Sequence, residues 1–198
     1  MTHYFEEHPE VASEVAIVDV ALPDVAFTMA TDRGVFSHGH VDTGTSLLLR
    51  EAPPPAAEGD LLDLGCGSGA IALTLALRSP AARVWAIDVN ARALSLTAAN
   101  AARNGVTTIS AVLPDDVPED SRFGTIWSNP PIRIGKPALQ RLLLRWLARL
   151  DPGGTAVFVV QKHLGADSLQ RWLGEQGHPA QRIASRAGFR LLQVDAPS

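Results

Sequence analysis

The chain has 198 residues, 46% of them hydrophobic, and a formal net charge of −4, values typical of one globular domain with a substantial core. No apolar run is long enough to span a bilayer, and the amino terminus lacks a basic segment followed by an apolar one, so we expect a cytoplasmic protein without a membrane partner. The single cysteine, Cys66, excludes an internal disulfide and any multi-cysteine zinc site, and we expect no bound metal.

Charge is divided unevenly along the sequence. Residues 1–130 carry 7 basic against 17 acidic residues, a net charge of −10, whereas residues 131–198 carry 10 against 4, a net charge of +6. The acidic average argues against a nucleic-acid partner, but the basic carboxyl-terminal third indicates an anionic one. Solvated arginines on helix faces explain the same numbers, so charge alone leaves the partner open.

Residues 1–52 are predicted to form a small β extension followed by a loop and a short helix. β-branched residues in the runs 14–21 and 25–31 flank a Pro-Asp turn, which is typical of a strand pair. A stretch rich in glycine and small polar residues follows over 31–45, ahead of a helix expected over 46–51. A polar loop at this place is expected to cover a ligand.

Residues 53–198 alternate short apolar runs with helical segments. Besides one strand that ends at a glycine-rich turn, strands are expected over 83–87, 108–113, 123–128, 155–161, 180–184 and 189–195. Helices are expected over 70–78, 91–104, 138–150 and 167–174, with a turn at 151–154. This alternation predicts an α/β fold with a doubly wound, mostly parallel sheet of seven strands and a closing hairpin.

The segment 61–69, Leu-Leu-Asp-Leu-Gly-Cys-Gly-Ser-Gly, predicts a strand, a tight turn and the start of a helix. Its glycines let the backbone approach a ligand, and N–H groups at the helix start can hold a polar ligand group. With Ala70 the turn matches the dinucleotide pattern G-x-G-x-x-G/A, whereas D-x-G-x-G-x-G is a pattern for S-adenosylmethionine (SAM). The candidate cofactor contacts here are Asp63, Gly65, Cys66, Gly67 and Gly69.

The ends of the next two strands supply further candidate cofactor contacts. Asp88 lies about 20 residues beyond the glycine turn, where a carboxylate can accept hydrogen bonds from both ribose hydroxyls. The same residue could instead cap the following helix, and as a ribose ligand it fits both cofactor classes. Val89 follows it, and Leu113 and Asp115 begin a loop that is expected to cover an adenine.

A second turn carries the candidate catalytic residues Asn129, Pro130, Pro131 and Ile132. An Asn-Pro-Pro turn brings the Asn129 side-chain oxygen close to the Pro130 carbonyl, and neither proline has an N–H that competes for these acceptors. Two outward acceptors suit the two protons of a planar exocyclic amine, whose nitrogen is then aimed at an electrophile. Asn129 is therefore expected to contact both the acceptor and the cofactor.

The motifs Asp63-Leu-Gly-Cys-Gly-Ser-Gly, Asp88 and Asn129-Pro-Pro-Ile, in this order, resemble those of class I SAM-dependent methyltransferases. The resemblance is narrowed by Gly34-Val-Phe-Ser-His-Gly-His-Val-Asp-Thr-Gly-Thr, Asn129-Pro-Pro-Ile-Arg-Ile-Gly-Lys and Gly188-Phe-Arg. Together they resemble the small-subunit ribosomal RNA guanine-N2 methyltransferase-like (MTS) family, in its short single-domain form. This implies a Rossmann-like fold, SAM as cofactor with S-adenosylhomocysteine as product, and methyl transfer to guanine N2.

The resemblance also implies roles for individual residues. The three glycines would pack against the methionine part of SAM, Asp88 would bind the ribose, and Phe36 with Ser37 would close over the cofactor. The Asn-Pro-Pro residues would orient the target amine. The chain departs from the pattern twice: Leu113-Pro114 precedes Asp115 where relatives often carry an acid for the adenine, and Ile132 stands where many amine methyltransferases carry an aromatic residue.

Basic residues beside the second turn are candidate RNA contacts. Arg133, Lys136 and Arg141, with Arg145 behind them, would receive phosphates of ribosomal RNA or of a ribosomal subunit. Three alternatives stay open from the sequence. They are methylation of a small molecule or a protein glutamine, an NAD(P)-binding oxidoreductase favoured by the dinucleotide pattern, and a SAM-binding module without catalysis.

Overall fold

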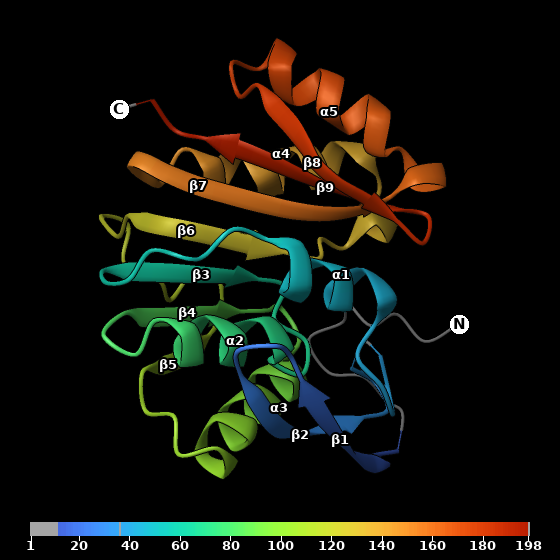
Figure 1. The fold of residues 1–198 in the computed structure, drawn as a ribbon, viewed down its shortest axis with the longest axis vertical. Coiled ribbons are helices and arrows are strands. Elements are labelled where there is room, and N and C mark those ends of the chain that lie inside the picture. Colours follow the sequence, from blue (N-terminus) through green and yellow to red (C-terminus); the bar gives the residue numbers. More distant parts are fainter. Residues whose placement is uncertain (1–11, 36, 198) are drawn as a thin grey trace.

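A seven-stranded sheet forms the centre of the molecule in a computed structural model that describes residues 12–35 and 37–197 (Figure 1). Its strand order is β5-β4-β3-β6-β7-β9-β8. The strands are β3 (Asp60–Leu64), β4 (Arg83–Ile87), β5 (Ile109–Val112), β6 (Phe123–Ser128), β7 (Leu150–Gln161), β8 (Ala180–Arg186) and β9 (Phe189–Asp195). Neighbours from β5 to β7 pair in parallel, and β9 is antiparallel to both β7 and β8. The predicted mostly parallel α/β sheet is confirmed.

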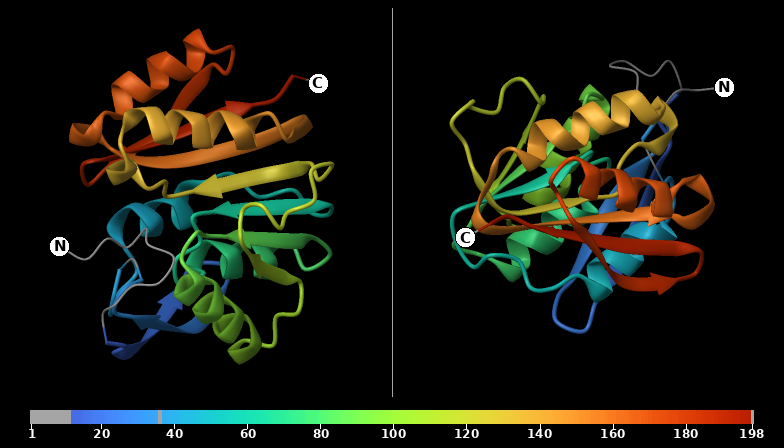
Figure 2. Two further views of the ribbon diagram at one scale, coloured as in Figure 1. Left: turned by 180° about the vertical axis from the view of Figure 1, so that it is seen from behind. Right: turned by 90° about the horizontal axis from the view of Figure 1, so that it is seen from above.

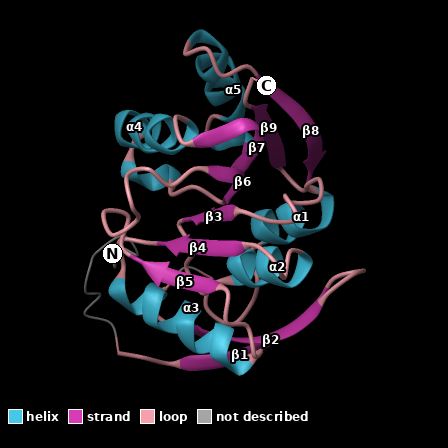
Figure 3. Cartoon of the chain, turned by 90° about the vertical axis from the view of Figure 1, so that its left-hand side faces the viewer, coloured by secondary structure: helices cyan, strands magenta, loops and turns pink. Residues whose placement is uncertain are grey.

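Helices cover both faces of this sheet. They are α1 (Thr43–Glu51), α2 (Ala70–Arg78), α3 (Ala91–Arg103), α4 (Lys136–Leu147) and α5 (Ala166–Glu175), with the 3-10 turns η1 (Ile132–Ile134) and η2 (Lys162–Leu164). Figure 2 shows α4 across the back of the sheet, and Figure 3 shows α1 and α2 on the other side of the strands. No helix in the described part of the chain is both long and apolar enough to cross a membrane.

Alternating side chains of the strands supply two separate cores. Leu61 and Val157 pack in the cluster that contains α1 and α2, whereas their neighbours Leu62 and Phe158 pack in the cluster with α4 and α5. All four side chains are almost completely buried. Because successive strand residues point to opposite faces, a continuous apolar run is required wherever a sheet is covered on both sides.

Three predicted boundaries are corrected by the structure. The turn expected at 151–154 is wrong, because β7 begins at Leu150 and these residues are absorbed in an irregular pairing with β6. Helix α4 begins two residues earlier than expected and ends three residues earlier, since Pro137 occupies its first turn, where no N–H is needed. Helix α1 begins at Thr43 because Asp42 caps it.

The amino-terminal strand pair is confirmed as the antiparallel hairpin of β1 (Val15–Ala21) and β2 (Ala26–Asp32). The hairpin packs on α3, where the side chain of Asn100 bonds both the N–H and the carbonyl of Ala30, at 2.7 and 2.8 Å. Asn104 bonds the N–H and carbonyl of Thr28 in the same way, at 3.2 and 2.9 Å. Two side chains of α3 thus supply hydrogen-bond partners to backbone groups of β2, as a neighbouring strand would.

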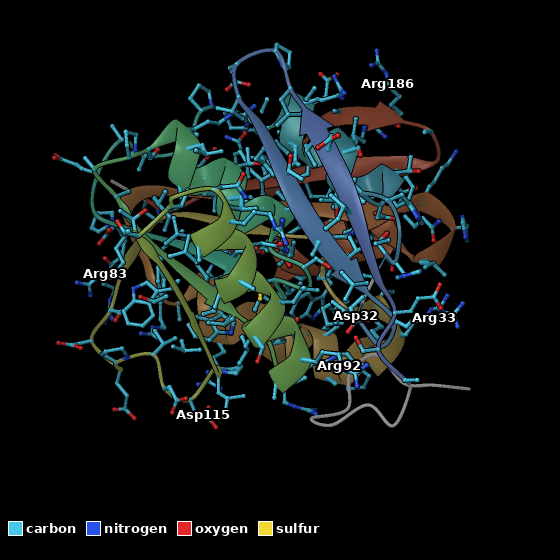
Figure 4. All side chains as sticks on the ribbon, turned by 90° about the horizontal axis from the view of Figure 1, so that it is seen from below. Asp32, Arg33, Arg83, Arg92, Asp115 and Arg186 are labelled. Carbon is cyan, nitrogen blue, oxygen red and sulfur yellow. The ribbon has the colours of Figure 1, made fainter. Side chains whose placement is uncertain are left out.

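Arg92 also holds the end of the hairpin at which β2 finishes. Arg92 of α3 donates to the carbonyl of Arg33 at 2.8 Å and lies 3.9 Å from the carboxylate of Asp32, and Figure 4 shows these three residues together. The hairpin is therefore held along its length against the helix that follows β4.

We expect Asn100→Ala to lower the free energy of unfolding by about 2–4 kcal/mol, because it leaves buried backbone groups of β2 without partners. Asn100 also donates to the carbonyl of Ser68 at 2.9 Å, so the substitution removes a hydrogen bond to the glycine turn as well. Urea denaturation measures the change. The exposed Gln181→Ala serves as control and should stay within about 0.5 kcal/mol of the wild type; equal stability of both variants would contradict the assignment.

Candidate functional site

A pocket of about 430 Å³, partly open to solvent, lies at the carboxyl ends of β3 and β6. Four segments meet there: β2, the linker into α1, the glycine turn with the start of α2, and the turn after β6. The lining residues are Met29, Thr31, Ser37, His40, Val41, Asp42, Thr45, Gly65, Cys66, Gly67, Ser68, Ala70, Ile71 and Asn129. The two turns predicted to carry the chemistry therefore share one pocket.

The glycine turn is held against the end of β4. The N–H groups of Gly65 and Cys66 both donate to the carbonyl of Ile87 at 2.9 Å. Gly69 has φ +87°, and a Cβ there would lie 2.9 Å from the Thr97 hydroxyl, so only glycine fits this position. A Cβ on Gly65 would lie 3.9 Å from Pro131, which shows how closely the two turns approach each other.

Two carboxylates lie beneath the glycine turn, one fully and one partly buried. Asp63 is fully buried, and its Oδ2 accepts from the N–H of Ala72 at 2.9 Å. Asp88 accepts from the N–H groups of Gly67 and Asn90, each at 3.0 Å. Burial raises the pKa of both carboxyls, and the charge of Asp88 raises the pKa of Asp63 further.

The alternative role of Asp88 as a helix cap is wrong. Asn90 caps α3, and its side-chain oxygen accepts from the N–H groups of Arg92 and Ala93 at 2.9 and 3.4 Å. The Asp88 carboxylate instead joins the end of β4 to the glycine turn. A carboxylate with two oxygens has further lone pairs for a ligand hydroxyl.

Two buried polar atoms at this place lack a hydrogen-bond partner within residues 12–35 and 37–197. They are the hydroxyl of Ser68, a residue that lines the pocket, and Oδ1 of Asp63, which is fully buried behind the glycine turn and is not itself a lining residue. The start of α2 also has no side-chain cap. Since buried polar groups normally have partners, unsatisfied ones at a pocket indicate where a polar ligand binds. A ligand with a cationic end and hydrogen-bonding groups fits this wall.

Cys66 occupies the pocket wall as a packed side chain. It is buried, and the hydroxyl of Thr97 donates to its sulfur at 3.5 Å. Burial raises the pKa of its thiol well above the usual range, and the neighbouring Asp88 and Asp63 raise it further. The thiolate is disfavoured, so Cys66 is not arranged as a nucleophile.

Asn129 has a defined orientation at the other side of the pocket. Its Nδ2 donates to Oδ2 of Asp42 at 2.9 Å and to the hydroxyl of Thr45 at 3.0 Å. Both amide protons are used, and the amide oxygen is left as the group for a ligand. The Pro130 carbonyl accepts from the N–H of Ile132 at 2.8 Å, a competing donor that the sequence analysis omitted, and it keeps one lone pair.

The pocket residues that come from the hairpin, the linker and the first turn of α1 are not predicted as site residues from the sequence, apart from Ser37. Asp42 is the important one, because it caps α1 and orients Asn129 at the same time. An aspartate directly before a helical apolar run is a helix-start signal and predicts the cap. The other missed lining residues are Met29, Thr31, His40, Val41, Thr45, Ser68 and Ile71.

Several predicted cofactor contacts lie outside this pocket. Val89 and Leu113 are exposed apolar side chains after the paired strands β4 and β5. Asp115 is largely exposed and forms an ion pair with Arg145 at 2.8 Å. Ser37 lines the pocket with φ +66°, whereas Phe36 lies outside the described residues. The cofactor roles of all these residues stay predictions.

The predicted RNA contacts fall into two groups. Arg133, Lys136 and Arg141 are exposed, and none has an ion pair with another described residue. Arg145 is different, because it bonds the carbonyl of Pro114 as well as Asp115 and so fastens the loop after β5. These three cations therefore lie in η1 and the first half of α4, in the segment that follows the turn after β6.

A second hollow of about 550 Å³, also open to solvent, adjoins these cations. It lies between η1 and α4 on one side and η2 and α5 on the other, and Val160 at the end of β7 forms part of it. Ile132 and Lys136 line it. The turn after β6 thus borders two hollows, with Asn129 in the first and Ile132 in the second.

The strand order, the glycine turn after β3 and the oriented asparagine after β6 together define a Rossmann-like domain of the methyltransferase class. The chain belongs to the methyltransferase small domain family, whose model matches residues 26–193. The family resemblance found in the motifs is confirmed. Membership also favours the SAM pattern of the glycine turn over the dinucleotide pattern.

Two curated relatives differ in how much of them the chain covers. The uncharacterized protein YbxB of Bacillus subtilis is 34% identical over 195 residues, 97% of each chain. Ribosomal RNA small subunit methyltransferase C of Pseudomonas aeruginosa is 36% identical over 168 residues, 81% of this chain and 48% of that protein. The chain spans nearly all of YbxB and about half the length of the methyltransferase C relative.

A solved structure supports the fold. The T. thermophilus 16S rRNA N2 G1207 methyltransferase (RsmC), in complex with AdoMet and guanosine, superposes with a TM-score of 0.78 at 24% identity. The match covers 95% of this chain and 52% of that one.

We expect the stability of the ligand-free protein to fall as pH rises through the raised pKa of Asp63. In that window the folded state holds a proton that the unfolded chain, with a carboxyl pKa of about 3.9, has already released. Unfolding free energies from urea titrations over a pH series measure the slope. Asp63→Asn should reduce the slope of the unfolding free energy against pH to the smaller contribution of Asp88. An unchanged slope would contradict the assignment to Asp63.

Proposed function

We propose that the protein is a SAM-dependent N-methyltransferase that methylates an exocyclic amino group, and that its acceptor is guanine N2 of ribosomal RNA. The observation that carries the proposal is the orientation of Asn129, which lines the pocket built by the glycine turn and whose amide oxygen has no partner among the described residues. The relatives named ribosomal RNA small subunit methyltransferase C support the choice of acceptor.

Residues that line the pocket, together with residues at the adjoining strand ends, can hold each part of the cofactor. The Asp63 carboxylate and the Ser68 hydroxyl, both with unsatisfied atoms, suit the amino-acid end. Asp88 at the end of β4 suits the ribose hydroxyls, and the exposed apolar Val89 and Leu113 suit the two faces of an adenine. When bound, SAM supplies a methyl group activated by a sulfonium leaving group.

The turn after β6 would position the acceptor. The Asn129 amide oxygen and the remaining lone pair of the Pro130 carbonyl can accept the two amine protons, which aims the nitrogen lone pair at the methyl carbon. Such orientation is worth up to about 7–11 kcal/mol of the barrier. No strong base is needed, because the nitrogen becomes acidic only as the methyl group is transferred. Water can then take the proton.

Charge and shape beside the turn favour a nucleic acid as acceptor. Arg133, Lys136 and Arg141 are exposed cations in the segment that follows Asn129, which has a net charge of +6 over residues 131–198. The apolar second hollow, bordered by Ile132 and Lys136, offers space for a planar base whose backbone lies on these cations. Ribosomal RNA, free or in a subunit, is the partner that we infer.

We expect Asn129→Ala to lower kcat by about 100-fold or more, because the amine loses its orientation. The dissociation constant of SAM should change by less than about threefold, since most of the predicted cofactor contacts lie in the glycine turn and at the ends of β4 and β5. Calorimetry with SAM and NAD measures binding, and transfer of labelled methyl from SAM to ribosomal RNA, ribosomal subunits or protein measures turnover. Gln181→Ala is the control. Full activity of Asn129→Ala, or binding of NAD without SAM, would overturn the proposal.

We expect Arg141→Ala to weaken RNA binding and to reduce the salt dependence of the binding constant by about 0.7 in slope, the value for one phosphate of a single strand. Arg103→Ala, which removes an exposed arginine at the end of α3, should leave the slope unchanged. Fluorescence titrations at several salt concentrations measure both. Equal slopes for the two variants would refute a phosphate contact at α4.

A further inference from the structure

We propose that Asp42 is a positioning residue of the acceptor site, which orients and polarises the Asn129 amide so that its oxygen holds the acceptor amine. This inference rests on the proposed methyl transfer. In that reaction the amine nitrogen donates its lone pair to the methyl carbon, the carbon–sulfur bond breaks, and its electron pair stays on sulfur. The nitrogen gains positive charge and then releases a proton to water.

The contacts of one carboxylate oxygen carry the proposal. Oδ2 of Asp42 accepts from the N–H groups of Gly44 and Thr45 at 2.8 and 3.1 Å, which is the capping of α1. It also accepts from Nδ2 of Asn129 at 2.9 Å, a contact that a helix cap does not require. Asp42 thus joins the start of α1 to a residue 87 positions away in sequence.

These contacts leave only one orientation for the amide of Asn129. A carboxylate accepts hydrogen bonds and cannot donate one, so the NH₂ end of Asn129 must face Asp42. The second NH₂ proton goes to the Thr45 hydroxyl at 3.0 Å. The amide oxygen consequently faces away from Asp42 and Thr45, where an acceptor amine can reach it.

The charge of Asp42 has a second consequence. A hydrogen bond from an amide NH₂ group to a carboxylate is charge-assisted, and linked hydrogen bonds polarise one another. The Asn129 oxygen therefore becomes a stronger acceptor. Its partner, the amine, becomes positively charged during transfer, so the interaction is stronger in the transition state than with the bound substrate.

The position of Asp42 is fixed by tight packing at the first turn of α1. A Cβ on Gly44 would lie 2.7 Å from the ring of Phe189 and 2.9 Å from Oδ2 of Asp42. No side chain fits between the start of β9 and this carboxylate. Asp42 and Thr45 both line the cofactor pocket together with Asn129, so the cap is also part of the site.

Three substitutions at one position separate the roles of Asp42. Asp42→Ser keeps a capping hydroxyl but is too short to reach Asn129, whereas Asp42→Ala removes both contacts. Asp42→Asn preserves the shape and an oxygen acceptor and removes the charge. We expect Asp42→Ser to keep the thermal stability of the wild type and to lower kcat at least about tenfold, with SAM affinity within about threefold. The kcat of Asp42→Asn should lie between that of Asp42→Ser and that of the wild type.

A double-variant cycle with Asn129→Ala gives a readout that a purely structural role would not move. If Asp42 acts through Asn129, the double variant Asp42→Ser with Asn129→Ala should be no slower than Asn129→Ala alone. If Asp42→Ser had the kcat of the wild type, the role of Asp42 would be limited to capping α1. The proposal would also be overturned if the double variant lowered kcat by the product of the two separate reductions. A loss of SAM affinity as large as the loss of kcat would overturn it as well.

The outcomes keep this inference apart from the proposed function. A wild-type protein that binds SAM and transfers no methyl group to RNA, protein or small amines would refute the function. Methyl transfer by the wild type that is insensitive to Asp42→Ser would refute only the role of Asp42. Thr45→Val tests the second amide proton by the same measurements and should lower kcat, whereas the exposed control Gln181→Ala should not.

Discussion

Parallel pairing of β3 with β6 is the constraint on which the site depends. Residues Leu61 to Asp63 pair with Thr125 to Trp127, and the hydroxyl of Ser128 donates to the carbonyl of Leu64 at 2.6 Å. Two parallel neighbours end at the same edge of a sheet, where ligands bind in open α/β folds. The glycine turn and the Asn-Pro-Pro turn therefore face one another, although 59 residues separate Gly69 from Asn129 in the chain.

Residues of the amino-terminal segment form the remaining part of the site. The hairpin is tied to α3 by asparagine side chains, and α1 is tied to the turn after β6 by Asp42. Met29 and Thr31 of β2 line the same pocket as Gly65. The division into a unit of residues 1–52 and a unit of residues 53–198 stays a prediction, and we propose that the two act as one structural unit.

Buried charge at the pocket opposes stability and favours binding. Asp63 and Asp88 lie under the glycine turn with pKa values raised by burial, and one oxygen of Asp63 has no partner among the described residues. A core built for stability alone would replace such groups by apolar ones. A cationic ligand with hydroxyl groups would supply the missing partners, which links the energetic cost of this region to its proposed use.

The sequence by itself determined the order of strands and helices along the chain, the sharp turn at Gly65 to Gly69 and the turn at Asn129 and Pro130 after a strand, because backbone preferences and side-chain periodicity act over a few residues. The order of these motifs was also enough to identify the family. Only the tertiary structure decided that Asp42 orients Asn129, and that Arg145 forms an ion pair with Asp115 while Arg141 has none with any residue that the structure describes. Each of these pairings joins distant segments, and a local pattern carries no information about which partner the packing brings within hydrogen-bond distance.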